Sequence, residues 1–177
     1  MRRNRHCPYR RVADNQTIIT PRTLIMQLFI VAVGKARGSA EQQLAKDWLG
    51  RLPEGGSIHE IESKLPAGAK RTEDEGMRLL RAVPAGAALA ILDPRGKDHS
   101  SEDLAALIGA WRDNGYGSAA FAIGGADGHA ASIRQKALRT ISFGRATWPH
   151  MLCRAMLAEQ LYRASMILAG HPYHRSN

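Results

Sequence analysis

A chain of 177 residues can form one ordinary domain with a hydrophobic core and is too short for two domains of typical size. Apolar residues make up 44% of the sequence and charged residues 23%, a balance that excludes disordered and membrane-spanning classes. The net charge is +9, but residues 1–25 contribute +5 of it, so the rest of the chain is only mildly basic and favours a nucleic-acid partner weakly.

The first 25 residues carry six arginines, a single acid and no periodic apolar pattern. They are weakly similar to an organellar transit peptide, but we favour a disordered basic arm or a start codon assigned too far upstream. We expect one folded domain over residues 26–177. The apolar run Leu24–Val33 is about half as long as a bilayer span, so no membrane association is expected. The two cysteines, Cys7 and Cys153, give no disulfide framework and are typical of a reducing cytoplasm.

Short apolar runs alternate with amphipathic stretches along the rest of the chain. Strands are predicted at 28–33, 57–62, 87–92, 119–123 and 140–143, and helices at 40–52, 73–83, 101–114, 129–138 and 149–169. Ser39 and Ser101 are the predicted caps of two of these helices, and Asp93–Gly96 is predicted to be a turn that ends the third strand. Strands that alternate with helices predict an α/β fold, with a mainly parallel sheet and helices on both faces.

Ligands of such sheets bind beyond the carboxyl ends of the strands, so the loops after Leu92, Ile123 and Phe143 are the candidate sites. The loop Gly124–Gly128 could bring backbone amides close to a nucleotide-like ligand, or it could be only a tight strand-to-helix turn. It lacks the spacing of a dinucleotide fingerprint and the ribose-binding acid that follows one, which disfavours a nicotinamide dehydrogenase.

Aromatic and titratable side chains gather near the last predicted helix. Trp148 could stack on a purine, although a tryptophan lies more often in a core or an interface. Tyr173, His174 and Arg175 suit a phosphate and a base, and the alternative is a frayed chain end. Because the helix separates His150 and Cys153 from the tail histidines by about 25 Å, no metal site is expected.

The last helix carries apolar residues on more than one face, which favours burial on several sides together with a subunit interface. We expect Ala158 to belong to that interface. Glu159 and Arg163 are spaced as a structural ion pair.

Five segments together carry a specific resemblance to a known family. They are, in chain order, MQLFIVAVGKAR, LDPRGK, IGGADG, ISFGRATWPH and LAEQLYRASMILAGHPYHR. Over residues 26–175 the sequence closely resembles the large-subunit ribosomal RNA pseudouridine N3-methyltransferases, the RlmH type, of the SPOUT superfamily. Residues 1–25 lie outside the resemblance.

The resemblance implies a C-terminal deep trefoil knot that binds S-adenosylmethionine, and a homodimer joined through the last helix, with 23S ribosomal RNA in the ribosome as the substrate. It implies cofactor contacts at Leu92, Gly124, Phe143, Gly144, Arg145, Ala146, Thr147 and Trp148. It also implies that the tail reaches the substrate pocket, with Tyr173, His174 and Arg175 as the catalytic candidates.

Methyl transfer is an in-line displacement, so most of the acceleration must come from orientation. The acceptor nitrogen of an imide carries a proton, which His174 or Arg175 could remove or whose loss they could stabilise. Two other functions fit the same residues: methylation of another RNA such as transfer RNA, and non-catalytic binding to the ribosome.

Overall fold

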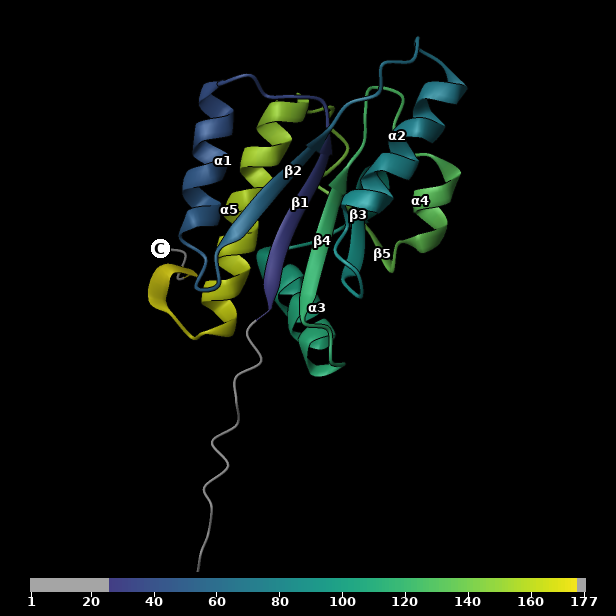
Figure 1. Ribbon diagram of the computed structural model, residues 1–177. Helices are drawn as coiled ribbons and strands as arrows, with labels where there is room; N and C mark the ends of the chain where they lie inside the picture. Colours follow the sequence, from purple (N-terminus) through teal and green to yellow (C-terminus); the bar gives the residue numbers. More distant parts are fainter. Residues whose placement is uncertain (1–25, 175–177) are drawn as a thin grey trace, which may run out of the picture.

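The computed structural model describes residues 26–174 (Figure 1). The strands are β1 (Gln27–Val33), β2 (Gly56–Ile61), β3 (Ala88–Asp98), β4 (Ser118–Ile123) and β5 (Arg139–Ser142). The helices are α1 (Ala40–Gly50), α2 (Ala69–Ala82), α3 (Ser101–Asp113), α4 (Ala131–Lys136) and α5 (His150–Leu168), followed by the short 3-10 helix η1 (Pro172–His174). The expectations for residues 1–25, for Arg175 and for the side chain of His174 fall outside what the structure describes.

The five strands form one sheet in the order β2-β1-β4-β3-β5, and every neighbouring pair is parallel. Helices α1, α3 and α5 pack on one face, and α2 and α4 pack on the other (Figure 1). The predicted α/β class is therefore confirmed. The deep knot stays a prediction.

Alternate residues of the central strands point to opposite faces of the sheet, and both sets are buried. On β1, Ile30 and Ala32 belong to the core under α1, α3 and α5, whereas Val31 and Val33 belong to the core under α2 and α4. A strand covered on both faces has no solvent side, which explains why its sequence is continuously apolar rather than alternating.

The third strand does not end where the sequence predicts. The segment Asp93–Gly96 was expected to be a turn after Leu92, but β3 continues to Asp98. Ile141 of β5 is paired with both Leu92 and Lys97, so the four residues between them form an irregularity within the strand. A Cβ on Gly96 would lie 2.8 Å from the carbonyl carbon of Ile141, so only glycine lets the chain return this closely to β5.

The structure corrects three predictions about where the helices begin and which residues cap them. Ser39 caps α1 as predicted, but α3 is capped by Ser100, whose hydroxyl accepts the amide hydrogen of Asp103 in a capping box. The predicted cap Ser101 instead donates its hydroxyl to Gln160 of α5. Helix α2 begins at Ala69 rather than Glu73, and α4 spans Ala131–Lys136 rather than 129–138.

Helix α5 is the most central helix, since it packs against α1, α3 and β1. Ala158 and Leu161 are fully buried within this single chain. The expectation that Ala158 lies at a subunit interface is therefore wrong. A helix that is apolar on all sides can be buried entirely by its neighbours in the same chain, so its apolar width does not by itself indicate a subunit interface.

Arg154 is the buried charged residue on this otherwise apolar helix, and its side chain is only 2% exposed. Its guanidinium donates to the carbonyl oxygens of Val33 and Gly34, each at 2.7 Å, and to Oε1 of Glu60 at 2.7 Å. Burial lowers the pKa of Arg154, and the carboxylate of Glu60 opposes that shift. Arg154 thus fastens the start of α5 to the ends of β1 and β2.

Candidate functional site

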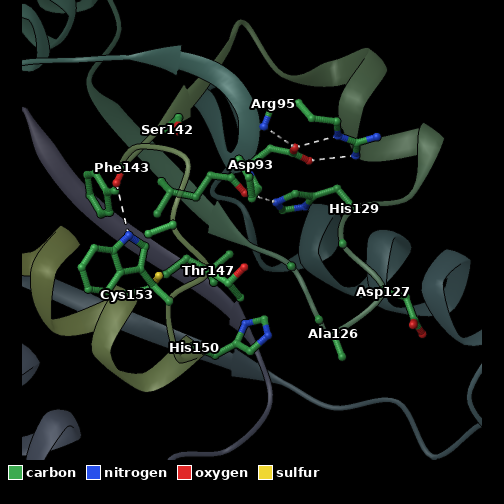
Figure 2. Close-up of a pocket in the computed structure, with 18 of the residues that line it drawn as sticks. Asp93, Arg95, Ala126, Asp127, His129, Ser142, Phe143, Thr147, His150 and Cys153 are labelled. Carbon is green, nitrogen blue, oxygen red and sulfur yellow. Dashed lines mark hydrogen bonds and ion pairs between the residues drawn. The ribbon is translucent and has the colours of Figure 1, made fainter.

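A pocket of about 490 Å³ opens at the carboxyl ends of β4 and β5 and at the irregular segment of β3 that follows Leu92 (Figure 2). The three segments predicted as candidate sites form its walls, because neighbouring parallel strands bring these segments to one edge of the sheet, although the segment after Leu92 belongs to β3 and is not a loop. Thr147 and His150 lie on one side of the pocket, and Ala126 and Asp127 lie on the other (Figure 2). The volume is in the range of small-molecule sites, which is roughly 300–1,000 Å³.

The glycine loop after β4 forms one wall. Gly128 donates its amide hydrogen to Gly125, and its φ of +80° favours glycine. A Cβ on Gly124 would lie 2.7 Å from the carbonyl oxygen of Gly128, and a Cβ on Gly125 would lie 2.6 Å from a carboxylate oxygen of Glu75. The glycines therefore let the loop close tightly on itself and on α2, which confirms the turn interpretation, and the binding of a ligand by this loop stays a prediction.

The loop between β5 and α5 forms the opposite wall. Gly144 has a φ of +89°, and the space where its Cβ would stand is open, which leaves room for a ligand beside the backbone. The hydroxyl of Ser142 accepts the amide hydrogen of Gly144 and donates to its carbonyl oxygen. The indole of Trp148 is 38% exposed and donates to the carbonyl oxygen of Phe143 at 3.2 Å. Trp148 is thus held at the pocket with its ring still accessible.

Asp93 is the buried charge at the edge of the pocket. Its carboxylate accepts hydrogen bonds from Nε of Arg95 at 2.9 Å and from Nη2 of Arg134 at 2.7 Å. The hydrogen bonds from Arg95, against the opposing effect of burial, hold the pKa of Asp93 far below its usual value. The carboxylate therefore stays ionised, and its charge is offset by two cations.

His129 lies beside Asp93 in the same wall (Figure 2). Its Nε2 lies 2.8 Å from the carbonyl oxygen of Leu92, so Nε2 carries the hydrogen and donates it. Its Nδ1 is buried without a hydrogen-bond partner among the described residues. Burial lowers the pKa of His129, and the ring is neutral at pH 7.

Tyr173, the tail candidate whose side chain the structure describes, lies elsewhere. Tyr173 donates its hydroxyl to Glu159 at 3.1 Å, and its ring is 4.9 Å from the ring of Tyr162 and 4.9 Å from the guanidinium of Arg163. The predicted ion pair between Glu159 and Arg163 is confirmed at 2.6 Å. Burial raises the pKa of Tyr173, so the phenol keeps its proton. Tyr173 does not line the pocket.

Most of the predicted cofactor residues share this pocket, although their contacts with a cofactor stay a prediction. The residues in its walls are Leu92, Gly124, Phe143, Gly144, Ala146, Thr147 and Trp148. Arg145 does not line it and is exposed. Sequence reasoning did not select Asp93, His129 and Arg134. Asp93 belongs to the quoted LDPRGK segment, which could have indicated it, whereas nothing in the sequence pattern indicates the other two.

Residues 26–174 contain neither a candidate metal site nor a candidate membrane span. No group of three or more histidine, cysteine, aspartate or glutamate side chains is placed to hold a metal ion. No helix in this part of the chain has the length and apolar character needed to cross a membrane.

Comparisons with known proteins agree with the geometry. Residues 26–174 match the family described as "Predicted SPOUT methyltransferase". Two curated relatives, from Paramagnetospirillum magneticum and Rhodospirillum centenum, are 49% and 48% identical and carry the name "Ribosomal RNA large subunit methyltransferase H". Each alignment covers 85% of this chain, and 99% and 100% of the respective relative.

The fold has a distant likeness among solved structures. The SpoU methyltransferase AviRb from Streptomyces viridochromogenes, solved in complex with AdoMet, aligns with 12% identity and a TM-score of 0.43. The alignment covers 90% of this chain and 66% of that chain. At this level of similarity we draw no conclusion from the match about the fold or the function of this chain. The family match and the identity to the curated relatives show that the chain belongs to the SPOUT methyltransferase family.

Proposed function

We propose that this protein uses S-adenosylmethionine to methylate N3 of a pseudouridine in large-subunit ribosomal RNA. The observation that carries the proposal is the convergence of two strand-end loops and the irregular segment of β3 on one pocket, in a chain nearly half identical to enzymes named for this RNA. The chain spans essentially the full length of those relatives.

The pocket suits the cofactor in three ways. Gly144 leaves open space beside a backbone turn, and Gly124 allows the glycine loop to close. Trp148 presents an accessible aromatic ring that can stack on an adenine. S-adenosylmethionine supplies an electrophilic methyl group when bound. The protein's task is then to hold the acceptor nitrogen in line with that group and to remove or stabilise its proton.

The proton-handling groups are proposed to come from a second copy of the chain. Helix α5 has 19 residues, so about 28 Å separate its start at the pocket from its far end. The chain then turns back, and Tyr173 is anchored to Glu159 on the side of α5 that faces α1. The short helix η1 lies beside α1, away from the carboxyl ends of the strands (Figure 1). We therefore propose that the tail that follows Tyr173, with His174 and Arg175, serves the pocket of the partner in a homodimer.

A groove of about 560 Å³ is the proposed contact surface for that partner. It lies between α1, α5 and the start of α3, and its apolar members include Leu44, Leu152 and Met156. Leu44 is 46% exposed in the single chain. Exposed apolar side chains in a groove are typical of a protein interface.

The defining experiment incubates the protein with radiolabelled S-adenosylmethionine and three substrates: assembled ribosomes, free 23S RNA and transfer RNA. Nucleoside mass spectrometry of the product should find N3-methylpseudouridine from ribosomes. Methylated transfer RNA alone would favour the other RNA substrate. A chain that binds ribosomes but shows no calorimetric signal with the cofactor would be a non-catalytic ribosome-binding protein.

Mixed dimers test the assignment of the tail to the partner. Ala146→Trp should block the pocket, because Ala146 lines it and is exposed. Arg175→Ala should leave the pocket intact and impair the tail. An equal mixture of the two inactive variants should recover about a quarter of the wild-type rate, because half of the dimers then hold one complete site. If each tail served its own pocket, the mixture would stay inactive.

A further inference from the structure

The far end of the glycine loop is fastened to the neighbouring strand by a closed ring of hydrogen bonds. His129 donates from Nε2 to the carbonyl oxygen of Leu92 at 2.8 Å. Arg134 donates from Nε to the backbone carbonyl of His129 at 3.0 Å, and its Nη2 contacts Oδ2 of Asp93 at 2.7 Å. Since Asp93 follows Leu92 directly, the peptide bond between them completes the ring.

Each member of this ring is largely withdrawn from water. The side chain of Asp93 is 3% exposed, that of Arg134 is 30% exposed, and His129 as a whole residue is 7% exposed. Hydrogen bonds to ionised groups in a partly dry setting are stronger than neutral bonds at the surface. Asp93 is additionally held by Arg95, which fixes the carboxylate independently of Arg134.

The ring joins two walls of the pocket. The loop leaves the sheet at Gly124, at the end of β4, whereas Leu92 and Asp93 stand at the bend in β3. The outer side of the loop end is packed against α2, since a Cβ on Gly76 would lie 2.6 Å from Cβ of Ala130. The ring restrains the inner side, which faces the pocket.

We propose that Asp93, Arg134 and His129 form a clamp that fixes the spacing between β3 and the glycine loop and thereby sets the width of the cofactor pocket. His129 and Arg134 are positioning residues: they act through the backbone that they hold. The proposal rests on the proposed function, since it concerns the pocket assigned to S-adenosylmethionine.

The chemistry of His129 explains why its loss should weaken cofactor binding more than folding. Leucine at this position fills similar space and removes the buried, unpartnered Nδ1, so the folded chain loses little. It also removes the donor to Leu92, so the loop samples wider arrangements. The cofactor then binds only those molecules whose loop is in the narrow arrangement, and its apparent affinity falls with the fraction of such molecules.

The test compares His129→Leu, His129→Gln, Arg134→Ala and the double variant His129→Leu/Arg134→Ala, with Lys136→Ala as the control. Lys136 lies on the same helix, is exposed and forms no side-chain hydrogen bond or ion pair within residues 26–174. Calorimetry measures Kd for S-adenosylmethionine, steady-state kinetics separate KM from kcat, and hydrogen exchange follows the amides of residues 124–130 without any ligand.

His129→Leu should raise Kd and the KM for the cofactor about two- to tenfold, the effect of one net hydrogen bond, with kcat and the melting temperature nearly unchanged. His129→Gln should recover most of the affinity, because its Nε2 can donate to the same carbonyl. Amides of the loop should exchange faster in His129→Leu and in Arg134→Ala. The fold-increase in Kd of the double variant should be smaller than the product of the fold-increases of the two single variants, because either substitution alone already opens the ring.

Wild-type affinity in His129→Leu, or strictly multiplicative effects in the double variant, would overturn the clamp. So would loop exchange no faster than in Lys136→Ala. A wild-type protein that does not bind S-adenosylmethionine would instead refute the proposed function, while the exchange measurement would still report whether the ring holds the loop.

Discussion

Replacing Arg154 by methionine removes the charged group that joins α5 to the sheet while keeping much of its volume. The change leaves two backbone carbonyls, at Val33 and Gly34, without this donor, and leaves Glu60 without its cation. Breaking a buried pair by removing one partner costs about 3–5 kcal/mol. Because whole domains are stable by only about 5–15 kcal/mol, Arg154→Met should lose a large part of the free energy of unfolding.

Urea unfolding at one fixed protein concentration measures the loss, since dimerisation would make the midpoint depend on concentration. Arg163→Met is the matched control on the same helix. Its partner is Glu159 and its side chain is 28% exposed, so its ion pair should contribute at most about 1 kcal/mol.

Adding Glu60→Gln to Arg154→Met should recover part of the stability, because it removes the uncompensated carboxylate. The reasoning would be refuted if Arg154→Met lost no more stability than Arg163→Met. It would also be refuted if the double variant were less stable than Arg154→Met alone, since the remaining charge could not then be the source of the cost.

Three further predictions follow from the fold and the pocket. Gly124→Ala should weaken cofactor binding at least tenfold in calorimetry, because its Cβ would collide with Gly128, whereas Gly117→Ala, whose Cβ meets nothing within 4 Å, should bind as the wild type does. Ala158→Arg should give an unfolded or aggregated chain in circular dichroism and sedimentation; a folded monomer would contradict the burial of Ala158. The folded-state pKa of His129 lies below its ordinary value of 6.5, so its contribution to stability is complete above pH 6.5 and is lost as the pH falls below it. The melting temperature of the wild type should therefore drop more between pH 6.5 and 5 than that of His129→Leu, and parallel curves would refute this.

Hydrophobic periodicity was enough to find the elements and the edge of the sheet where they converge. Buried parallel strands are short and continuously apolar, so β1 and β4 stand out from the flanking amphipathic helices. The rule that ligands bind at the carboxyl ends of such strands then predicted three segments, and all three line the pocket, although the one after Leu92 is an irregular part of β3 and not a loop.

Long-range pairing is what local pattern could not supply. Arg154 and Glu60 are 94 residues apart, so nothing near either one indicates the other. After Gly96 the chain pairs with β5 again, and this pairing keeps it in β3. The residues Asp93–Gly96 favour a turn locally, but their sequence carries no information about the contact with β5. Ala158 looked like surplus apolar surface because a helix wheel does not reveal how many neighbours surround the helix.

The central place of α5 also governs how the chain can fold during synthesis. Its buried side chains complete the core beneath β1, yet the ribosome makes them only after all five strands. At about 5–20 residues per second, roughly 6–25 seconds pass between the synthesis of β1 and that of α5. During that interval only α1 and α3 are available to cover this face of the nascent sheet, and the part that α5 will cover is open to mispairing and to chaperones. Truncation just before His150 should therefore yield an aggregating chain rather than a smaller folded domain.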